Sequence, residues 1–174
     1  MTDKPDYNEN ETELQYHKIG HEWYVYYHLP FDTDWSLESY KKIFSFDTVE
    51  DALIILDEFN ELTIQKCMIF IMKNTIQPTW EDPENRNGSC ISFKIPYNNI
   101  YTTWKDTIMK IICNNISEKE NMLDVINGIS LSPKKKFSIL KIWLNTTDIK
   151  SSDVFNKLNQ LDHDNCIIKK HIES

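Results

Sequence analysis

The feature that most restricts the fold of this chain is a series of short strand-like runs joined by short connections. The runs are rich in β-branched and aromatic residues, which is typical of β-strands. They lie at residues 22–29, 39–46, 67–72, 91–95, 125–131, 137–144 and 166–172. Because short connections favour antiparallel pairing of successive strands, we expect a mainly antiparallel sheet.

Three further segments have the residue spacing of helices. Apolar residues recur at helical intervals in 46–62, where Asp47 and Glu50 have the spacing of a capping box. Residues 101–116 place a tryptophan and three isoleucines on one face, and serines precede a shorter apolar pattern in 151–161. The sequence therefore predicts an α+β fold, a curved antiparallel sheet with helices on one face. The other face is then free to bind a ligand.

Length and composition restrict the domain organisation. The chain has 174 residues, of which 40% are hydrophobic, enough for the core of one domain. Residues 1–15 are polar and acidic, so we expect a disordered tail that precedes a single domain over 16–174. No apolar run approaches the roughly 20 residues of a membrane-spanning helix, and the N-terminus lacks the apolar core of a secretory signal. We therefore expect a cytoplasmic protein.

Charge and motif content exclude several function classes. The net charge of −8 repels nucleic acid overall, so any RNA contact has to be local. The four cysteines form no CxxC pair, and we interpret them as reduced thiols without a zinc site. No glycine-rich phosphate loop occurs and the histidines are dispersed, so we expect neither a cofactor nor an enzymatic site.

Two tryptophans with a neighbouring acid form the candidate site. Trp35 lies in a loop after the first strand run, and Trp80 and Glu81 precede the turn-rich stretch DPENRNG. Either tryptophan alone is more often a core residue, and a loop glutamate alone is more often solvated. Together they suit a flat ring such as guanine. Two indoles can stack on its faces, and one carboxylate can accept its two neighbouring N–H groups.

Longer motifs resemble the eukaryotic translation initiation factor 4E family. They are FDTVED, which begins at Phe46, and TWEDPENRNG, with Trp35 eleven residues before Phe46 and ILKIWL downstream. The resemblance runs from about His17 to the C-terminus. It implies the cupped-hand fold of that family, a curved sheet of about eight antiparallel strands backed by three helices on its convex face. The Ile-, Asn- and Lys-rich composition fits a divergent member from an AT-rich genome, such as that of a protist or a large DNA virus.

The resemblance also implies a function, binding of the 7-methylguanosine cap of messenger RNA in translation initiation, without catalysis. Trp35 and Trp80 match the tryptophans that sandwich 7-methylguanine, and Glu81 matches the acid that holds its N1–H and N2–H groups. The Trp80 backbone N–H would meet O6, and Trp143 matches the tryptophan at the N7-methyl group. Methylation gives the ring a positive charge, which strengthens stacking on indoles and acidifies N1–H for the carboxylate.

The chain departs from the family at the residues that clamp the cap triphosphate. Lys134, the first of three adjacent lysines, matches one basic position, whereas Cys90 and Ile139 replace two others. The family's C-terminal loop with a further lysine has no counterpart in this sequence. The lysine cluster also fits an ordinary solvated turn.

Neighbouring lysines can restore part of this charge. Strand alternation puts Lys141 on the same face as Trp143, two residues away. We expect Lys141, Lys135 or Lys136 to replace part of what is lost. The candidate phosphate-binding residues are then Lys134, Lys136 and Lys141.

A second departure concerns partner binding. After VED the family carries an outward-facing tryptophan that receives a helical YxxxxLΦ peptide from the scaffold factor 4G or from repressor proteins. Leu53 stands at that position, where an ordinary core leucine is the alternative. We expect a monomer whose scaffold interaction is weakened or altered. The candidate partner-binding residues are His17, Ile19, Val49, Leu53, Lys105 and Met109.

Other functions stay open at this point. The chain can be a cap reader that acts as a translational repressor or decoy without engaging the usual scaffold factor. It can also be a protein-interaction scaffold of the same fold that has lost cap binding, although the intact set of Trp35, Trp80, Glu81 and Trp143 argues against this. A nucleotide-processing enzyme is disfavoured, because no nucleophile–base pair or metal cluster is apparent.

Overall fold

The computed structural model describes residues 15–158 and 161–172, so the predicted disordered tail lies outside the described residues except for Gln15. Within them, seven strands form one sheet in the order β2-β1-β3-β5-β6-β4-β7, and every neighbouring pair is antiparallel. The strands are β1 (Lys18–His28), β2 (Lys41–Thr48), β3 (Met68–Lys73), β4 (Ser89–Pro96), β5 (Ile126–Pro133), β6 (Phe137–Leu144) and β7 (Ile167–Lys170).

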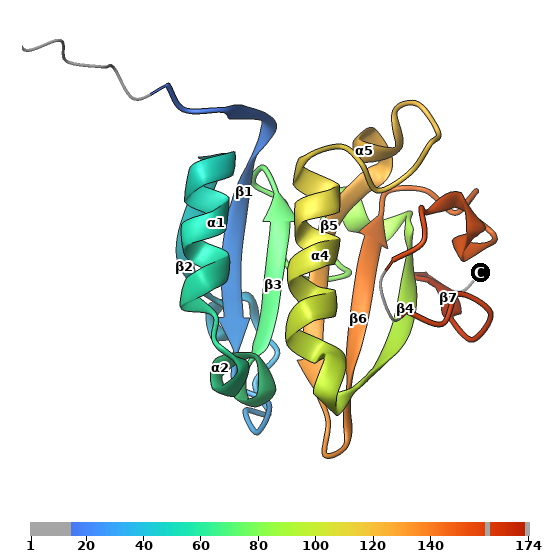
Figure 1. Ribbon diagram of the computed structural model, residues 1–174. Helices are drawn as coiled ribbons and strands as arrows, with labels where there is room; N and C mark the ends of the chain where they lie inside the picture. The colour runs from blue at the N-terminus through green and yellow to red at the C-terminus, as the bar shows by residue number, and fades with distance from the viewer. Residues whose placement is uncertain (1–14, 159–160, 173–174) are drawn as a thin grey trace, which may run out of the picture.

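Two long helices lie side by side over one face of this sheet (Figure 1). The α-helices are α1 (Val49–Glu58), α2 (Glu61–Lys66), α3 (Pro83–Arg86), α4 (Ile100–Ile112) and α5 (Met122–Val125). Short 3-10 turns add η1 (Leu37–Ser39), η2 (Tyr97–Asn99) and η3 (Ser152–Val154). No helix in the described ranges is long and apolar enough to cross a membrane.

Side-chain alternation along the strands creates two apolar clusters on opposite faces. In β1, Trp23 and Val25 belong to the main core beneath the helices, whereas Tyr26 belongs to a smaller cluster on the other side. We call that other side the open face, because α1 and α4 do not cover it (Figure 1). The smaller cluster comprises Tyr26, Phe70, Met72, Ile76 and Trp143.

The predicted fold class is confirmed. An antiparallel sheet carries helices on one face, and the strand count of the described residues is close to the expected eight. The face predicted for the helix over 101–116 is also confirmed, because Trp104, Ile108 and Ile111 are each 1% exposed. The short helices α2, α3 and α5 were not predicted, since a single turn or two carries too little periodicity to recognise.

The start of α1 differs from the predicted capping box by one residue. Thr48, the last residue of β2, caps the helix. Its Oγ1 accepts a hydrogen bond from the Asp51 N–H at 3.1 Å and donates one to Asp51 Oδ2 at 2.8 Å. Asp47 and Glu50 instead bond to the segment that begins β1. The pairing of Asp47 with Glu50 is therefore wrong, because β2 extends to Thr48.

The predicted helix over 151–161 is also wrong for the residues that the structure describes. After η3 the chain continues to Leu158 without helical structure. The Leu158 side chain is buried in the main core, and the Asn156 N–H donates to the carbonyl of Ile116 at 2.8 Å. Contacts with distant parts of the chain therefore replace the local hydrogen bonds of a helix.

Candidate functional site

The open face carries a pocket of about 440 Å³, the open-face pocket. Its walls come from the loops after β1 and β3 and from strands β3, β5 and β6. Six residues predicted for the site line it: Trp35, Trp80, Glu81, Trp143, Lys134 and Lys141. Lys136, also predicted, is not among the lining residues and lies at a neighbouring hollow. The fold thus brings together side chains that are more than 100 residues apart.

Trp35 and Trp80 differ from the core tryptophans in exposure. Their side chains are 53% and 48% exposed, whereas Trp23 and Trp104 are each 1% exposed. Leaving two large indoles in water forgoes the free energy that burying them would contribute. Exposed aromatic groups that line a pocket are typical of binding sites.

Trp35 is held by a residue that the sequence did not single out. Its ring stacks on the buried His28 ring, with centroids 4.3 Å apart and planes 5° from parallel. His28 Nε2 donates to the Asp34 carbonyl at 2.8 Å, because that carbonyl can only accept. The loop is fixed further by Asp34, whose carboxylate accepts the Ser36 N–H at 2.8 Å. One side of Trp35 is therefore occupied by His28.

The loop that carries Trp80 and Glu81 is fixed by a buried amide. Asn85, in α3, is fully buried and donates from Nδ2 to the carbonyls of Gln77 at 3.0 Å and Thr79 at 2.8 Å. Its Oδ1 accepts from Asn127 Nδ2 in β5 at 3.0 Å. The backbone just before Trp80 is therefore tied to the sheet.

Asp82 fixes the same loop on its other side. One carboxylate oxygen accepts the Gln77 N–H at 2.9 Å, and the other accepts the Glu84 N–H in the first turn of α3 at 2.9 Å. Trp80 and Glu81 thus project from a short segment that is anchored before and after them. Sequence reasoning recognised the turn-forming residues here but not their individual partners.

Trp143 lies deeper than the other two tryptophans of the pocket. It is 8% exposed, and its Nε1–H donates to Ser130 Oγ on β5 at 2.9 Å. That bond satisfies its polar atom and fixes the ring orientation. Lys141 lines the same pocket, which confirms the strand alternation expected from the sequence.

Charge in and around the pocket is uneven. Among the described residues that line it, Glu81 is the one acid. A smaller hollow of about 260 Å³ adjoins the pocket and shares Trp80, Lys141 and Trp143 with it. Its other lining residues are Cys90, Lys169, Lys170 and His171. The site therefore offers a carboxylate beside two indoles, with basic side chains next to them.

His171 joins the C-terminal segment to α3 and to the residue before β4, and its environment predicts a pH dependence of stability. Its backbone N–H donates to the Gly88 carbonyl at 3.1 Å, and its ring Nδ1 lies 2.6 Å from the carbonyl oxygen of Asn85. Burial lowers the pKa of His171 below its ordinary value, although the bond to Asn85 opposes this shift. The unfolded chain then binds more protons than the folded protein, so stability falls as pH falls.

We therefore expect the melting temperature to fall as the pH falls through the ordinary histidine pKa of about 6.5, and to go on falling until the lower pKa of the folded protein is passed. In His171→Gln this dependence should be weaker, which thermal unfolding monitored by circular dichroism can measure. Part of the slope remains, because burial also lowers the pKa of His21. An identical slope in both proteins would contradict the role given to His171.

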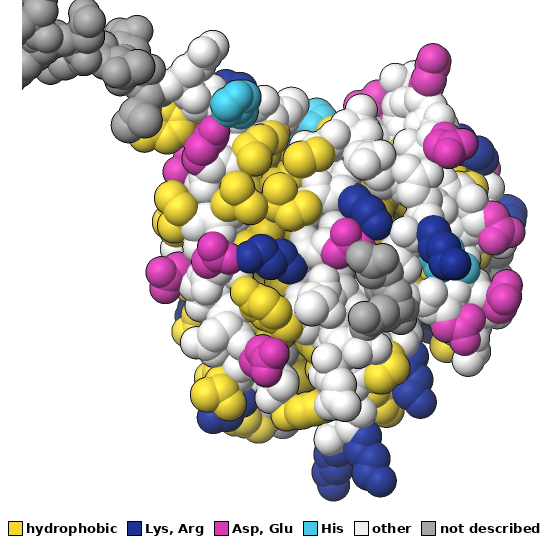
Figure 2. All heavy atoms as spheres, viewed as in Figure 1, with side chains coloured by type: hydrophobic (Ala, Val, Ile, Leu, Met, Phe, Trp, Pro, Cys, Tyr) yellow, Lys and Arg dark blue, Asp and Glu magenta, His cyan; other side chains and the backbone are white. Residues whose placement is uncertain are grey.

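The candidate partner-binding residues lie on the opposite side of the molecule, around α1 and α4. Hydrophobic side chains gather over these helices in Figure 2. Leu53 is 39% exposed, so it is not a core residue, and its neighbour Ile54 is 60% exposed. Lys105 of α4 forms an ion pair with Asp57 of α1, which joins the two helices.

The remaining candidates on this side are less exposed or engaged locally. Ile19 and Met109 are partly buried against the main core, and Val49 is half-buried at the first position of α1. His17 is exposed and bonds to Glu50 through both its backbone N–H and its ring. Leu53 and Ile54 are therefore the exposed apolar side chains that α1 offers to a partner.

Fold and site together define a class of protein. An open antiparallel sheet is covered by helices on one face and carries a pocket with exposed indoles on the other, an arrangement that suits a planar ligand. The sequence profile of the eukaryotic initiation factor 4E family matches residues 18–168. The chain therefore belongs to the eukaryotic initiation factor 4E family.

Curated relatives include plant and viral proteins. The chain is 28% identical over 158 residues to eukaryotic translation initiation factor isoform 4E of Capsicum annuum, covering 83% of this chain and 73% of the relative. It is 24% identical over 136 residues to the eukaryotic translation initiation factor 4E homolog of Acanthamoeba polyphaga mimivirus, covering 66% of this chain and 50% of that protein.

Solved structures of the family share the fold. A schistosome eIF4E, complexed with m7GpppG and 4E-BP, superposes with a TM-score of 0.70 at 24% identity, covering 79% of this chain and 77% of that chain. Ascaris suum eIF4E-3 with m7G cap gives a TM-score of 0.68 at 20% identity, covering 77% and 76%. At these identities the likeness shows the common fold.

Proposed function

We propose that this protein binds the 7-methylguanosine cap of messenger RNA and acts as a monomer in translation initiation in the cytoplasm. The observation that carries the proposal is the open-face pocket, where Trp35 and Trp80 are exposed beside Glu81, above the deeper Trp143. Solved relatives described above contain cap analogues, which supports the same ligand class. No bond is broken in this function, so it needs no catalytic residue.

The proposed contacts use each side chain for a separate chemical feature of the cap. Trp35 and Trp80 stack on the two faces of the base, and the Glu81 carboxylate accepts N1–H and N2–H. The Trp80 backbone N–H donates to O6, and Trp143 contacts the N7-methyl group. The positive charge of the methylated ring favours stacking between electron-rich indoles, which separates it from unmodified guanine.

Lysines next to the pocket suit the triphosphate. Lys134 and Lys141 line the pocket, and Lys136 lies at the hollow beside it. Cys90 is opposite Lys169 of β7, and Ile139 is opposite Lys94 of β4, so each lost basic position has a lysine on the neighbouring strand.

Tryptophan-fluorescence titration with 7-methyl-GTP and GTP in parallel tests this function. Stacking on Trp35 and Trp80 should quench the emission strongly with the methylated ligand and weakly with GTP. Glu81→Gln should retain quenching but bind about 10- to 100-fold more weakly, since one of two charge-assisted hydrogen bonds is replaced by a repulsive N–H contact. Folded protein that is not quenched by any methylated ligand would contradict the proposal and favour a scaffold without cap binding.

A helical peptide is the proposed partner of the α1 and α4 face. The apolar side chains of Leu53 and Ile54 suit an amphipathic helix of the scaffold-factor or repressor type. Leu53 is a smaller anchor than the family's tryptophan, and the Lys105–Asp57 ion pair bridges the two helices beside it. These features favour a weakened or altered scaffold interaction, so a translational repressor or decoy is the second candidate function.

Leu53→Trp should raise the affinity for a YxxxxLΦ peptide by about ten-fold, because tryptophan buries more apolar surface as an interface anchor. Isothermal titration calorimetry with a synthetic peptide measures this change. Leu62→Trp, at a position that is 64% exposed on α2, is the matched control and should leave the affinity unchanged. An equal gain in both variants would indicate non-specific apolar contact.

A further inference from the structure

The open face continues past the pocket to the tip of the β5–β6 hairpin, where there is a second hollow. Lys136 and Lys94 of this hollow were considered above for the triphosphate, whereas its other lining residues have no role in the contacts described so far. The hollow measures about 600 Å³ and is lined by Lys94, Pro96, Lys135, Lys136 and Phe137. We propose that this hollow, the hairpin hollow, binds the nucleotides that follow the cap. Phe137 is the stacking platform for a base, and the lysines contact phosphates. The proposal rests on the cap-binding function proposed above.

Strand register puts the hairpin hollow on the same face as the pocket. Alternate side chains of a strand point the same way, so Phe137 shares a face with Ile139, Lys141 and Trp143 of β6. Those three residues line the open-face pocket, which identifies that face. Phe137 therefore ends a row that starts at Trp143, roughly 20 Å away along the strand. An RNA that leaves the pocket along β6 passes Lys141 and reaches Phe137.

Lys94 lies where a phosphate and a base could be bound together. It faces Ile139 across the pairing of β4 with β6, and Pro96 faces Phe137 in the same register. The Lys94 Nζ lies 4.5 Å from the centroid of the Phe137 ring. A phosphate that binds Lys94 would bring its attached base next to that ring.

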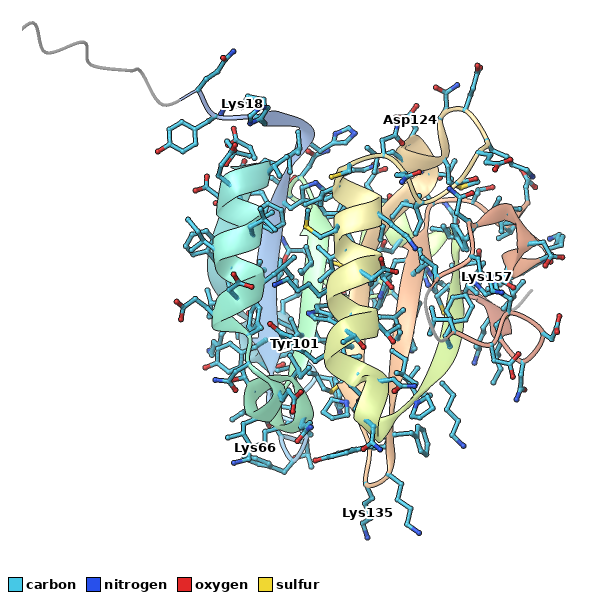
Figure 3. The ribbon with its side chains drawn as sticks, in the orientation of Figure 1. Lys18, Lys66, Tyr101, Asp124, Lys135 and Lys157 are labelled. Atoms are coloured by element: carbon cyan, nitrogen blue, oxygen red, sulfur yellow. The ribbon has the colours of Figure 1, made fainter. Side chains whose placement is uncertain are left out.

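Charge favours a polyanion at the hairpin hollow. Lys135 and Lys136 are exposed, and Lys135 extends from the hairpin tip away from the body of the protein (Figure 3). None of the described residues that line the hollow is acidic, although the whole chain has a net charge of −8. The positive charge is therefore local and continuous with that of Lys134 and Lys141.

This combination suits single-stranded nucleic acid. Proteins that bind a single strand without sequence preference pair a basic groove with aromatic rings on which bases stack. An acidic peptide would use the lysines but would gain little from Phe137. We therefore assign the hairpin hollow to RNA, continuous with the cap.

The test compares 7-methyl-GTP, a capped tetranucleotide and the same tetranucleotide without a cap, each titrated into wild type, Phe137→Leu and Lys94→Gln. The capped tetranucleotide should bind wild type about ten-fold more tightly than 7-methyl-GTP. Phe137→Leu should lose this gain and keep its affinity for 7-methyl-GTP within about two-fold. Lys94→Gln should reduce the gain and lower the salt dependence of tetranucleotide binding. Phe31→Leu, at an 80% exposed position outside the hollow, is the control.

Other outcomes would overturn the proposal. If Phe137→Leu still binds the capped tetranucleotide about ten-fold more tightly than 7-methyl-GTP, Phe137 is not a stacking platform for a base. If Lys169→Gln loses the tighter binding of the capped tetranucleotide while Phe137→Leu keeps it, the RNA runs over β7 and not along β6. In both cases 7-methyl-GTP binding by wild type would leave the proposed function standing, whereas absence of that binding would remove both proposals.

Discussion

Replacing Trp80 with alanine is expected to weaken 7-methyl-GTP binding by about 100-fold, which corresponds to roughly 3 kcal/mol. The substitution removes one stacking surface and the attraction between an indole and a cationic ring. The Trp80 side chain is 48% exposed, so its removal should affect folding little. Calorimetric titration, with thermal unfolding of the same samples, measures both quantities.

Phe31→Ala is the matched control for that experiment. Phe31 is an aromatic residue at 80% exposure in the loop that also carries Trp35, yet it does not line the open-face pocket. Its removal should leave affinity for 7-methyl-GTP unchanged. If Trp80→Ala binds as tightly as Phe31→Ala does, the stacking role of Trp80 is wrong.

Asn85→Ala should cause the largest loss of stability, about 3 kcal/mol and a fall in melting temperature of roughly 10 °C. The substitution leaves the Gln77 and Thr79 carbonyls and one Asn127 donor without the partner they have now. Buried polar groups that lose a partner cost about 1–3 kcal/mol each, with partial relief from water.

Cap affinity should fall together with stability in Asn85→Ala, because the Trp80 loop would lose its anchor. Asn87→Ala, at an exposed position just after α3, is the control and should change neither property appreciably. Thermal unfolding and 7-methyl-GTP titration of the two variants test this. A destabilised Asn85→Ala that binds the cap normally would show that the buried amide supports the fold without positioning the loop.

Local sequence signals were sufficient where a residue's role depends on its immediate neighbours. Trp35 and Trp80 were predicted to lie in loops because turn-forming residues surround them, and both are exposed at a pocket. Lys141 and Trp143 were predicted to share a face from their spacing in one strand, and they do.

Local sequence patterns do not predict the role of a residue when that role depends on a partner far along the chain. Asn85 looks like any turn residue, and its importance comes from Asn127, 42 positions later. His28 sits at the end of a strand with nothing to mark its stacking on Trp35. The helix predicted to start near Ser151 fails for the same reason, because long-range contacts outweigh its local pattern.

The stack of His28 on Trp35 also has a kinetic consequence. A side chain that is already ordered before the ligand arrives avoids the cost of about 0.5–1.5 kcal/mol for immobilising a free rotamer. Trp35 meets that condition, whereas Trp80 has no ring contact among the described residues. The ligand is then expected to stack first on the ordered Trp35 ring, and the Trp80 side chain is expected to become ordered afterwards. Substitutions at His28 should therefore change the association rate, whereas substitutions at Trp80 should change the residence time of the ligand.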